Sequence, residues 1–306
     1  MKPLLTEANR EERFMFCSSF INVDTNTFDD MYNRVHIDEK LFYLKPVKSK
    51  YYLVEGEDAP LRVSKSTRFI PKVMFVCAVA RPRFDTRDNQ HFDGKLGIWP
   101  FAVREPAKRG SCNRRKGTFF TKPLLVNQNE TRKMLVEKIL PAIVDKWPGN
   151  YRQHKILIQQ DNATPHIKST DPEWTEAVGA TGLDVDLVQQ PANSPDLNVL
   201  DLGLFSAIQS RQFKKHPTDL DELIAAVEKS FYEELPPKTI NNTFLMLQVC
   251  MEETILNDGG NNYKIRHMNK NKLEREGRLP VSIVASPDVM DKIGSKMPAA
   301  KRTVSV

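Results

Sequence analysis

Cysteine is scarce in this sequence, and so are segments that would direct a chain to a membrane. The four cysteines, Cys17, Cys77, Cys112 and Cys250, stand far apart and form no CxxC pair. This spacing argues against a zinc site and against a disulfide framework, and it suits a reducing compartment. No apolar run approaches the ~20 residues that a membrane span needs. The charged start MKPLLTEANREERF also lacks the apolar region of a signal peptide, so no membrane partner is expected.

What the chain does contain is enough apolar sequence for a substantial core. It has 306 residues, 40% of them hydrophobic, and this length allows one large domain or two smaller ones. The net charge of +6 is unevenly placed, because residues 259–306 hold ten Lys and Arg against four Asp and Glu. A second basic cluster, REPAKRGSCNRRK, spans residues 104–116. Such patches attract polyanions such as nucleic acid, but a solvated loop and a solvated tail explain the same charges.

Apolar periodicity predicts strands early in the chain and mostly helices later. We expect strands at 34–44, 51–55, 72–80, 155–160 and 183–189. We expect helices at 6–22, 129–147, 172–180, 199–213, 219–233 and 238–257. Thr6 can cap the first helix, and Pro141 should kink the second. This order indicates an α/β fold in which a mixed sheet carries helices on its faces.

Two stretches have weaker patterns. Residues 83–128 hold several Gly and Pro between short apolar pieces, which is typical of an irregular β-rich insertion. Beyond residue 257 the apolar periodicity fades, and we expect a mostly extended basic tail with room for one short helix. The predicted organisation is therefore a leading helix or linker at 1–30, a main domain at 31–257 and a basic tail at 258–306.

Two acidic residues lie where predicted strands give way to polar sequence. Asp38 ends the strand Val35–Asp38, and Asp161 directly follows the strand Ile156–Gln160. If these strands are parallel neighbours, the two carboxylates meet at one edge of the sheet. Carboxylates that close raise each other's pKa unless a cation lies between them, and oxygen ligands suit a hard ion such as Mg²⁺. The alternative is that each Asp only forms a turn at a strand end.

A third acid follows the next predicted strand, in the stretch QQPANSPDLNVLDLGLF. This stretch offers two candidates, Asp196 and Asp201. Five residues apart on a helix, they would point ~140° from each other and could not face one metal ion. Asp196 is better interpreted as a cap or loop residue, and Asp201 as the acid that points inward.

Three motifs now make the sequence recognisable. IDEK around Asp38, QQDNATPH around Asp161 and NSPDLNVLDLG around Asp201 resemble the catalytic motifs of mariner-type DNA transposases of the DDE/DDD superfamily. Thirty-nine residues separate Asp161 from Asp201, which is similar to the plant-type branch of the mariner elements. The resemblance extends over residues 1–257, and it departs mildly from the family at Leu41, where a tryptophan is usual, and at Thr164, where an arginine is common.

The resemblance implies a fold, a reaction and partners. The fold would be RNase H-like, and the activity would be cleavage of phosphodiester bonds and transfer of DNA strands. Asp38, Asp161 and Asp201 would hold two divalent ions, Mg²⁺ or Mn²⁺, of which one activates water or a 3′-hydroxyl and the other stabilises the leaving oxygen. DNA would be the substrate, a homodimer the acting form and the nucleus its place, to which the short basic PAAKR near the end adds weak support.

Other residues are candidates for supporting roles. Asn162 and His166 could steady the second acid or approach DNA, or they could form only a local turn and cap. Asn198 is expected to order the loop before Asp201, and His36 to pack in the core. Residues that could contact the phosphate backbone, or could simply be exposed, are Lys108, Arg109, Arg114, Arg115 and Lys116.

The resemblance also points to DNA-binding modules for which this sequence has little room. Mariner-type transposases have two helix-turn-helix modules before the catalytic domain, whereas only about thirty residues precede the strand of Asp38 here. KPLLTEANREERFMFCSSFIN resembles the linker and the first helix after those modules. A truncated gene copy, a cropped gene model and a captured domain with a new role all remain possible origins. The alternative function is a catalytically idle remnant that binds nucleic acid or oligomerises.

Overall fold

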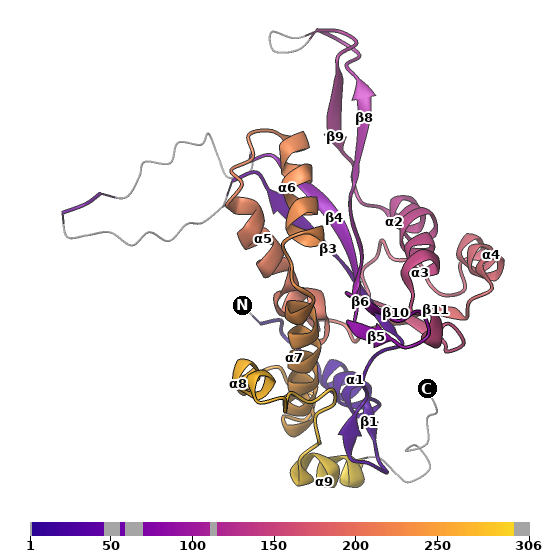
Figure 1. Cartoon of the computed structure of the whole chain (residues 1–306), viewed down its shortest axis with the longest axis vertical. Coiled ribbons are helices and arrows are strands. Elements are labelled where there is room, and N and C mark those ends of the chain that lie inside the picture. The colour runs from indigo at the N-terminus through magenta and orange to yellow at the C-terminus, as the bar shows by residue number, and fades with distance from the viewer. Residues whose placement is uncertain (1, 46–55, 59–69, 111–114, 297–306) are drawn as a thin grey trace.

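The structure is a computed structural model that describes residues 2–45, 56–58, 70–110 and 115–296. At its centre lies a five-stranded sheet with the strand order β11-β10-β3-β4-β7 (Figure 1). β3 and β11 run parallel to β10, whereas β4 is antiparallel to β3 and β7 is antiparallel to β4. The mixed sheet is thus as predicted, although the strand expected at 51–55 lies outside the described residues. The strands are Arg34–Tyr43 (β3), Lys72–Ala80 (β4), Lys95–Pro100 (β7), Ile156–Gln160 (β10) and Val185–Gln189 (β11).

Both faces of the sheet are covered, which explains the near-continuous apolar sequence of its central strands. Along β4, Phe75 belongs to one hydrophobic core and its neighbour Val76 to another, because successive side chains of a strand point to opposite faces. On β3, His36 is fully buried, and its ring lies edge-on to that of Phe244 with 5.4 Å between the centroids. His36 therefore packs in the core, as expected.

One face of the sheet is covered by α2 (Gln128–Met134), α3 (Leu140–Lys146) and α4 (Pro172–Thr181). Between α2 and α3 the chain forms a π-helical segment, η2 (Leu135–Ile139). Its wider turn accommodates Pro141, whose ring and missing amide hydrogen disturb a regular α-helix. The irregularity that we expected from Pro141 thus takes the form of a π-helical segment just before it.

The other face is covered by helices from both ends of the chain. They are α1 (Glu7–Ser18), α5 (Phe205–Phe213), α6 (Leu220–Tyr232) and α7 (Pro237–Leu256). Thr6 caps α1 as the sequence predicts, because its side chain accepts the Asn9 amide hydrogen. A small ribbon of β1 (Ile21–Asn22) and β2 (Thr27–Phe28) follows α1.

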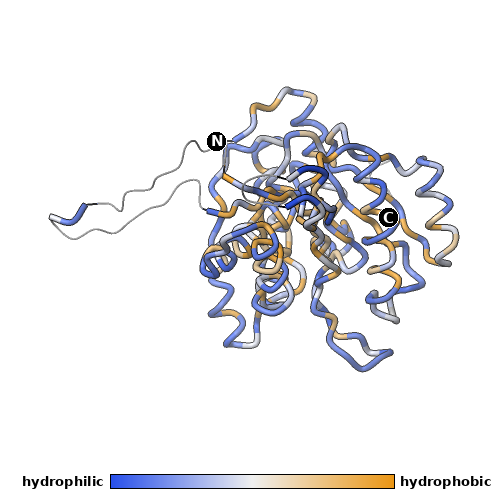
Figure 2. The backbone as a smooth tube through the Cα atoms, turned by 90° about the horizontal axis from the view of Figure 1, so that it is seen from above, coloured by the Kyte–Doolittle hydropathy of each residue, from blue (hydrophilic) through white to orange (hydrophobic). Residues whose placement is uncertain are grey.

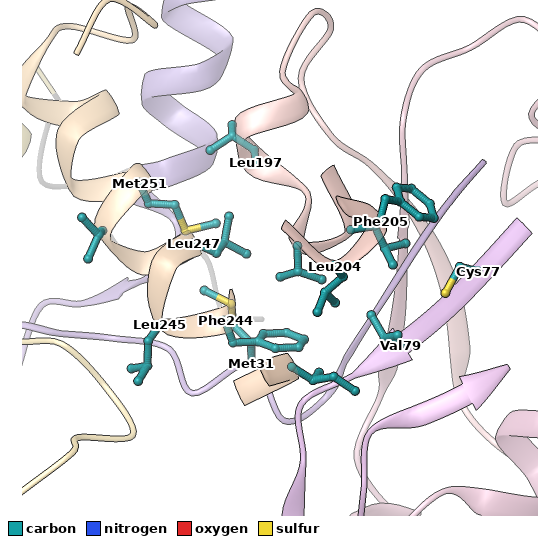
Figure 3. Packing of buried hydrophobic residues seen from close by; sticks show 14 of the residues in the cluster. Met31, Cys77, Val79, Leu197, Leu204, Phe205, Phe244, Leu245, Leu247 and Met251 are labelled. Carbon is teal, nitrogen blue, oxygen red and sulfur yellow. The ribbon is translucent and has the colours of Figure 1, made fainter. Parts of the chain in front are cut away.

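The core beneath α7 connects this helix to the sheet. In Figure 3, side chains of α7 and β4 meet those of the segment between β11 and α5, among them Val79, Leu197, Leu204, Phe244 and Leu247. Figure 2 shows hydrophobic segments gathered inside the body, with hydrophilic segments around them. The segment that carries Asp201 is therefore packed between a long helix and the sheet.

An arm projects from the sheet between β7 and α2. It is the hairpin of β8 (Ala102–Pro106) and β9 (Phe119–Pro123), which extends away from the body in Figure 1. A second, smaller hairpin pairs β5 (Arg83–Asp85) with β6 (Gln90–Phe92). Residues 83–128 are β-rich, as expected, but they are not an insertion throughout, because β7 is the edge strand of the central sheet.

The chain after α7 folds back onto the body. It contains two short helices, α8 (Lys270–Arg275) and α9 (Pro287–Lys296), where we expected mostly extended chain with room for one. Val289 and Ile293 of α9 are buried in the core that includes α7, because residues four apart share one helix face. The sequence PAAKR lies outside the described residues. Within the part of the chain that is described, no helix is both long and apolar enough to cross a membrane.

Candidate active site

Asp38 lies in the middle of β3, and not at its end as the sequence suggested. β3 continues to Tyr43, but its pairing with β10 stops at His36, which lies opposite Gln159. The space beside Asp38 is thus open on the β10 side, while β4 continues to pair on the other side. The carboxylate accepts the Glu39 amide hydrogen at 2.7 Å. The parallel pairing of β3 with β10 still brings Asp38 next to the end of β10, as we expected.

Asp161 is the first residue after β10, at the point where the chain leaves the sheet. Its Oδ1 accepts the Ala163 amide hydrogen at 2.9 Å and lies 2.8 Å from His166 Nδ1. The hydrogen bond with His166 lowers the pKa of Asp161 below its usual value, although partial burial opposes this. Asp161 is therefore ionised at neutral pH, and part of its charge is balanced by His166.

Asp201 lies in η5 (Leu200–Leu204), a π-helical turn that leads into α5. The loop before it is fixed by Asn198, whose side-chain amide donates to the Ile37 carbonyl of β3 at 3.1 Å. The Asn198 side-chain oxygen also accepts the Leu200 amide hydrogen at 3.0 Å. Asn198 is fully buried, so this bridge ties the start of η5 to the strand that carries Asp38.

The carboxyl groups of Asp38 and Asp201 are close enough to share a hydrogen bond. Burial and the nearby charge of Asp201 raise the pKa of Asp38 to about 8. Asp201 lines an open cavity and keeps contact with solvent, but burial by the surrounding protein still raises its pKa, while the charge of Lys40 opposes this. Two acids in this state bind one proton between them at neutral pH, or a cation in its place.

His166 bridges the two strands that carry the acids. Besides Asp161, it contacts Glu39 of β3, whose Oε2 lies 3.1 Å from His166 Nε2. Burial works against protonation, but the hydrogen bonds with Asp161 and Glu39 outweigh it and raise the pKa of His166 to about 11. The role of Glu39 was missed at the sequence level. No local pattern marks this contact, because Glu39 and His166 are 127 positions apart in the sequence and meet only in the folded chain.

The three aspartates line one cavity of about 360 Å³. Asn162 lines it too, and so do six consecutive residues from Gln190 to Pro195, which follow β11. The described residues contain no ready-made set of three acidic, His or Cys side chains spaced to hold a metal ion. Asp38 and Asp201 face each other, whereas Asp161 is engaged with His166. The closely spaced, charge-repelling pair fits a hard divalent cation, and Asp161 could join it by turning away from His166.

Of the basic residues singled out in the sequence, none that the structure describes lines this cavity. Lys108, Arg109, Arg115 and Lys116 lie exposed at the end of the β8–β9 arm, and Arg114 is outside the described residues. Asp196 does not line the cavity either. It belongs to the short 3-10 helix η4 (Pro195–Leu197), and its carboxylate forms an ion pair with Arg13.

A central mixed sheet with acids on β3, after β10 and on the helix after β11 defines an RNase H-like fold, as the sequence resemblance implied. Solved structures with this fold include a pre-cleavage Mos1 transpososome, at a TM-score of 0.60 and 17% identity over 86% of this chain. Another is the catalytic domain of Mos1 mariner transposase, at a TM-score of 0.55 and 16% identity over 86% of this chain and 100% of that domain.

Further similar structures are Mos1 paired-end complexes with Mn and with Mg, each 17% identical to this chain. The chain spans 66% of the protein chain in the transpososome, and 66% and 65% of those in the complexes with Mn and Mg. No protein-family model and no curated protein sequence matches it. At these identities the likeness establishes the fold, namely that of a mariner transposase catalytic domain.

Proposed function

We propose that this chain is the catalytic domain of a metal-dependent DNA transposase of the mariner type, which cleaves phosphodiester bonds and transfers DNA strands. The observation that carries the proposal is the meeting of three aspartates, from three separate segments, in one cavity of a transposase-like fold. Three acids so far apart in the sequence have no need to meet if each only forms a turn. Their shared cavity therefore favours the metal-binding interpretation over the structural one.

In this proposal, Asp38, Asp161 and Asp201 hold two divalent cations, Mg²⁺ or Mn²⁺. The bound ions would activate the attacking oxygen and stabilise the leaving one. The protein's own contribution is to supply carboxylates on the sheet and beside it, and to keep Asp161 ionised through His166. Glu39 orients His166 from the opposite side, and Asn162 at the cavity wall is placed to contact the DNA strand.

DNA is the proposed substrate, and the β8–β9 arm is its proposed second contact. The arm presents exposed basic side chains, which can neutralise phosphates without reading base sequence. The Mos1 neighbours are transposase complexes with paired transposon ends, so a homodimer is the proposed acting form. We further propose the nucleus as the site of this activity, because its proposed substrate is DNA.

The purified chain with nicked or single-stranded DNA provides the test. Cleavage is expected with Mn²⁺ or Mg²⁺, none with EDTA, and none in Asp161→Ala protein. Activity that survives in Asp161→Ala would contradict the assignment. The competing function, a binding module without catalysis, predicts salt-sensitive DNA binding that is unchanged in Asp38→Ala and no metal-dependent turnover.

A further inference from the structure

A partly buried polar cluster outside the cavity joins three parts of the chain. The Arg13 side chain of α1 is fully buried and donates through Nη1 and Nη2 to the two carboxylate oxygens of Asp196, at 2.7 Å each. The Tyr263 hydroxyl donates to the same carboxylate at 2.6 Å. The bidentate pair and the third hydrogen bond satisfy Asp196 with charge-assisted contacts, which are strong and directional.

Arg13 and Tyr263 are themselves held in place. Arg13 Nε donates to the Gly259 carbonyl at 2.8 Å. Gly259 has φ +80°, and a Cβ there would lie 1.8 Å from the Arg10 carbonyl oxygen, so α1 packs directly on the turn after α7. The Lys2 ammonium donates to the carbonyl of Tyr263 at 2.9 Å. The partners of Asp196 therefore form a fixed frame.

Asp196 and its partners support one wall of the cavity that the three aspartates line. The residues from Gln190 to Pro195 line the cavity, and Asp196 follows them directly, with its side chain outside the lining. Asn193 in this loop has φ +56°, a strained conformation that needs support from its surroundings. Two anchors provide it, since Asn198 binds β3 from the inside while Asp196 binds α1 and the segment after α7 from the outside.

We propose that Asp196 is a positioning residue, whose pairing with Arg13 and Tyr263 sets the loop between β11 and η5 so that Asp201 reaches the cation shared with Asp38. This proposal rests on the proposed function, because it concerns the same metal site. It explains why the NSPDLNVLDLG motif contains a second acid, Asp196, that does not line the cavity. It also assigns α1 and the segment after α7 a common task.

The test compares Asp196→Asn with wild-type protein and with a matched control, Asp171→Asn. Asp171 also pairs with an arginine, Arg132 Nη2 lying 2.8 Å from its Oδ2, but it does not line the cavity. Two responses to Mn²⁺ are measured for each protein. They are the concentration that gives half-maximal DNA cleavage and the rise in melting temperature caused by Mn²⁺, which reports binding without turnover.

Asp196→Asn is expected to need at least roughly tenfold more Mn²⁺ for half-maximal DNA cleavage, as is usual when a group that orients a metal ligand is lost. Its melting temperature should also respond less to Mn²⁺, while Asp171→Asn behaves as wild type in both measurements. A purely structural role would lower the melting temperature without metal and leave both Mn²⁺ responses unchanged. That result in Asp196→Asn overturns the proposal.

Tyr263→Phe covers the case in which Asp196→Asn does not fold, as judged by circular dichroism. It removes one hydroxyl from the cluster and keeps the Arg13 pair, so a smaller shift in the same direction supports the proposal, and an unchanged Mn²⁺ response overturns it. A wild-type chain that neither cleaves DNA nor responds to Mn²⁺ would instead refute the proposed function, and the positioning role with it.

Discussion

Replacing Asp38 by Asn should stabilise the metal-free protein, although it removes a proposed catalytic group. Burial and the charge of Asp201 raise the pKa of Asp38 to about 8, against an ordinary value of 3.8. The unfolded chain loses this proton near pH 4, whereas the folded chain keeps it to about pH 8. Stability therefore falls as the pH rises through this window, because the folded state binds the extra proton.

The size of the effect follows from the same numbers. Each tenfold change in proton affinity is worth about 1.4 kcal/mol, so holding the pKa of Asp38 near 8 instead of 3.8 costs at most about 6 kcal/mol at pH 8. The proton is shared with Asp201 and the cavity is open to water, which reduces the cost. We expect Asp38→Asn to be more stable than wild type by about 2–3 kcal/mol at pH 8 and by clearly less at pH 5.

Urea unfolding in EDTA at pH 5 and pH 8 measures this difference, and Asp161→Asn serves as the comparison of opposite sign. The pKa of Asp161 is lowered by His166, so its charge stabilises the folded state above pH 4, and its loss should destabilise the protein at both pH values. The electrostatic account of the cavity is refuted if Asp38→Asn is no more stable than wild type at pH 8. It is also refuted if the gain does not grow between pH 5 and pH 8.

Three further changes have expected outcomes. His166→Gln removes a cation whose pKa is raised to about 11. The stabilisation from this cation is fully present below pH 6.5 and is lost as the pH rises through 11. Urea unfolding should therefore show a free energy of unfolding lower by about 2–3 kcal/mol at pH 6, and a smaller difference at pH 10. Gly259→Ala forces a Cβ against the Arg10 carbonyl at φ +80° and should cost about 2–4 kcal/mol in the same assay. Replacing the exposed basic residues of the arm by Gln should leave the melting temperature unchanged; these residues are Lys108, Arg109, Arg115 and Lys116. If all four contact phosphates, the slope of log DNA affinity against log salt concentration should become shallower by roughly 3–4.

Most of the fold could be predicted from the sequence, because the apolar patterns that indicate helices and strands are local. The apolar run of β4 and the three- and four-residue spacing in α6 and α7 each reflect burial of one element, which a single stretch of sequence records. The place of β7 is different, since an edge strand within a Gly- and Pro-rich region is defined by its pairing with β4 and not by its own composition. The same holds for α9, whose buried face exists only because α7 lies beneath it.

The three acids of the site could be predicted from the sequence, but the residues that contact and position them could not. Asp38, Asp161 and Asp201 stand in motifs that can be compared along the sequence, and the structure brings them to one cavity. The contact of His166 with Glu39 spans 127 positions, and that of Arg13 with Asp196 spans 183. Such pairs depend on how elements from opposite ends of the chain pack, and no local pattern marks them.

The error about Asp38 shows how strand length determines where a site can form. Sequence alone suggests that a catalytic acid must end its strand, because polar side chains in the middle of a sheet are normally excluded from the core. β3 can carry an acid in its middle because its pairing with β10 stops at His36. This leaves space beside Asp38, the next residue on the same face of the strand. β4 meanwhile continues to pair with β3 as far as Tyr43 and keeps it rigid. The acid is thus held by an uninterrupted strand and still faces an opening, which combines precise placement with access for substrate.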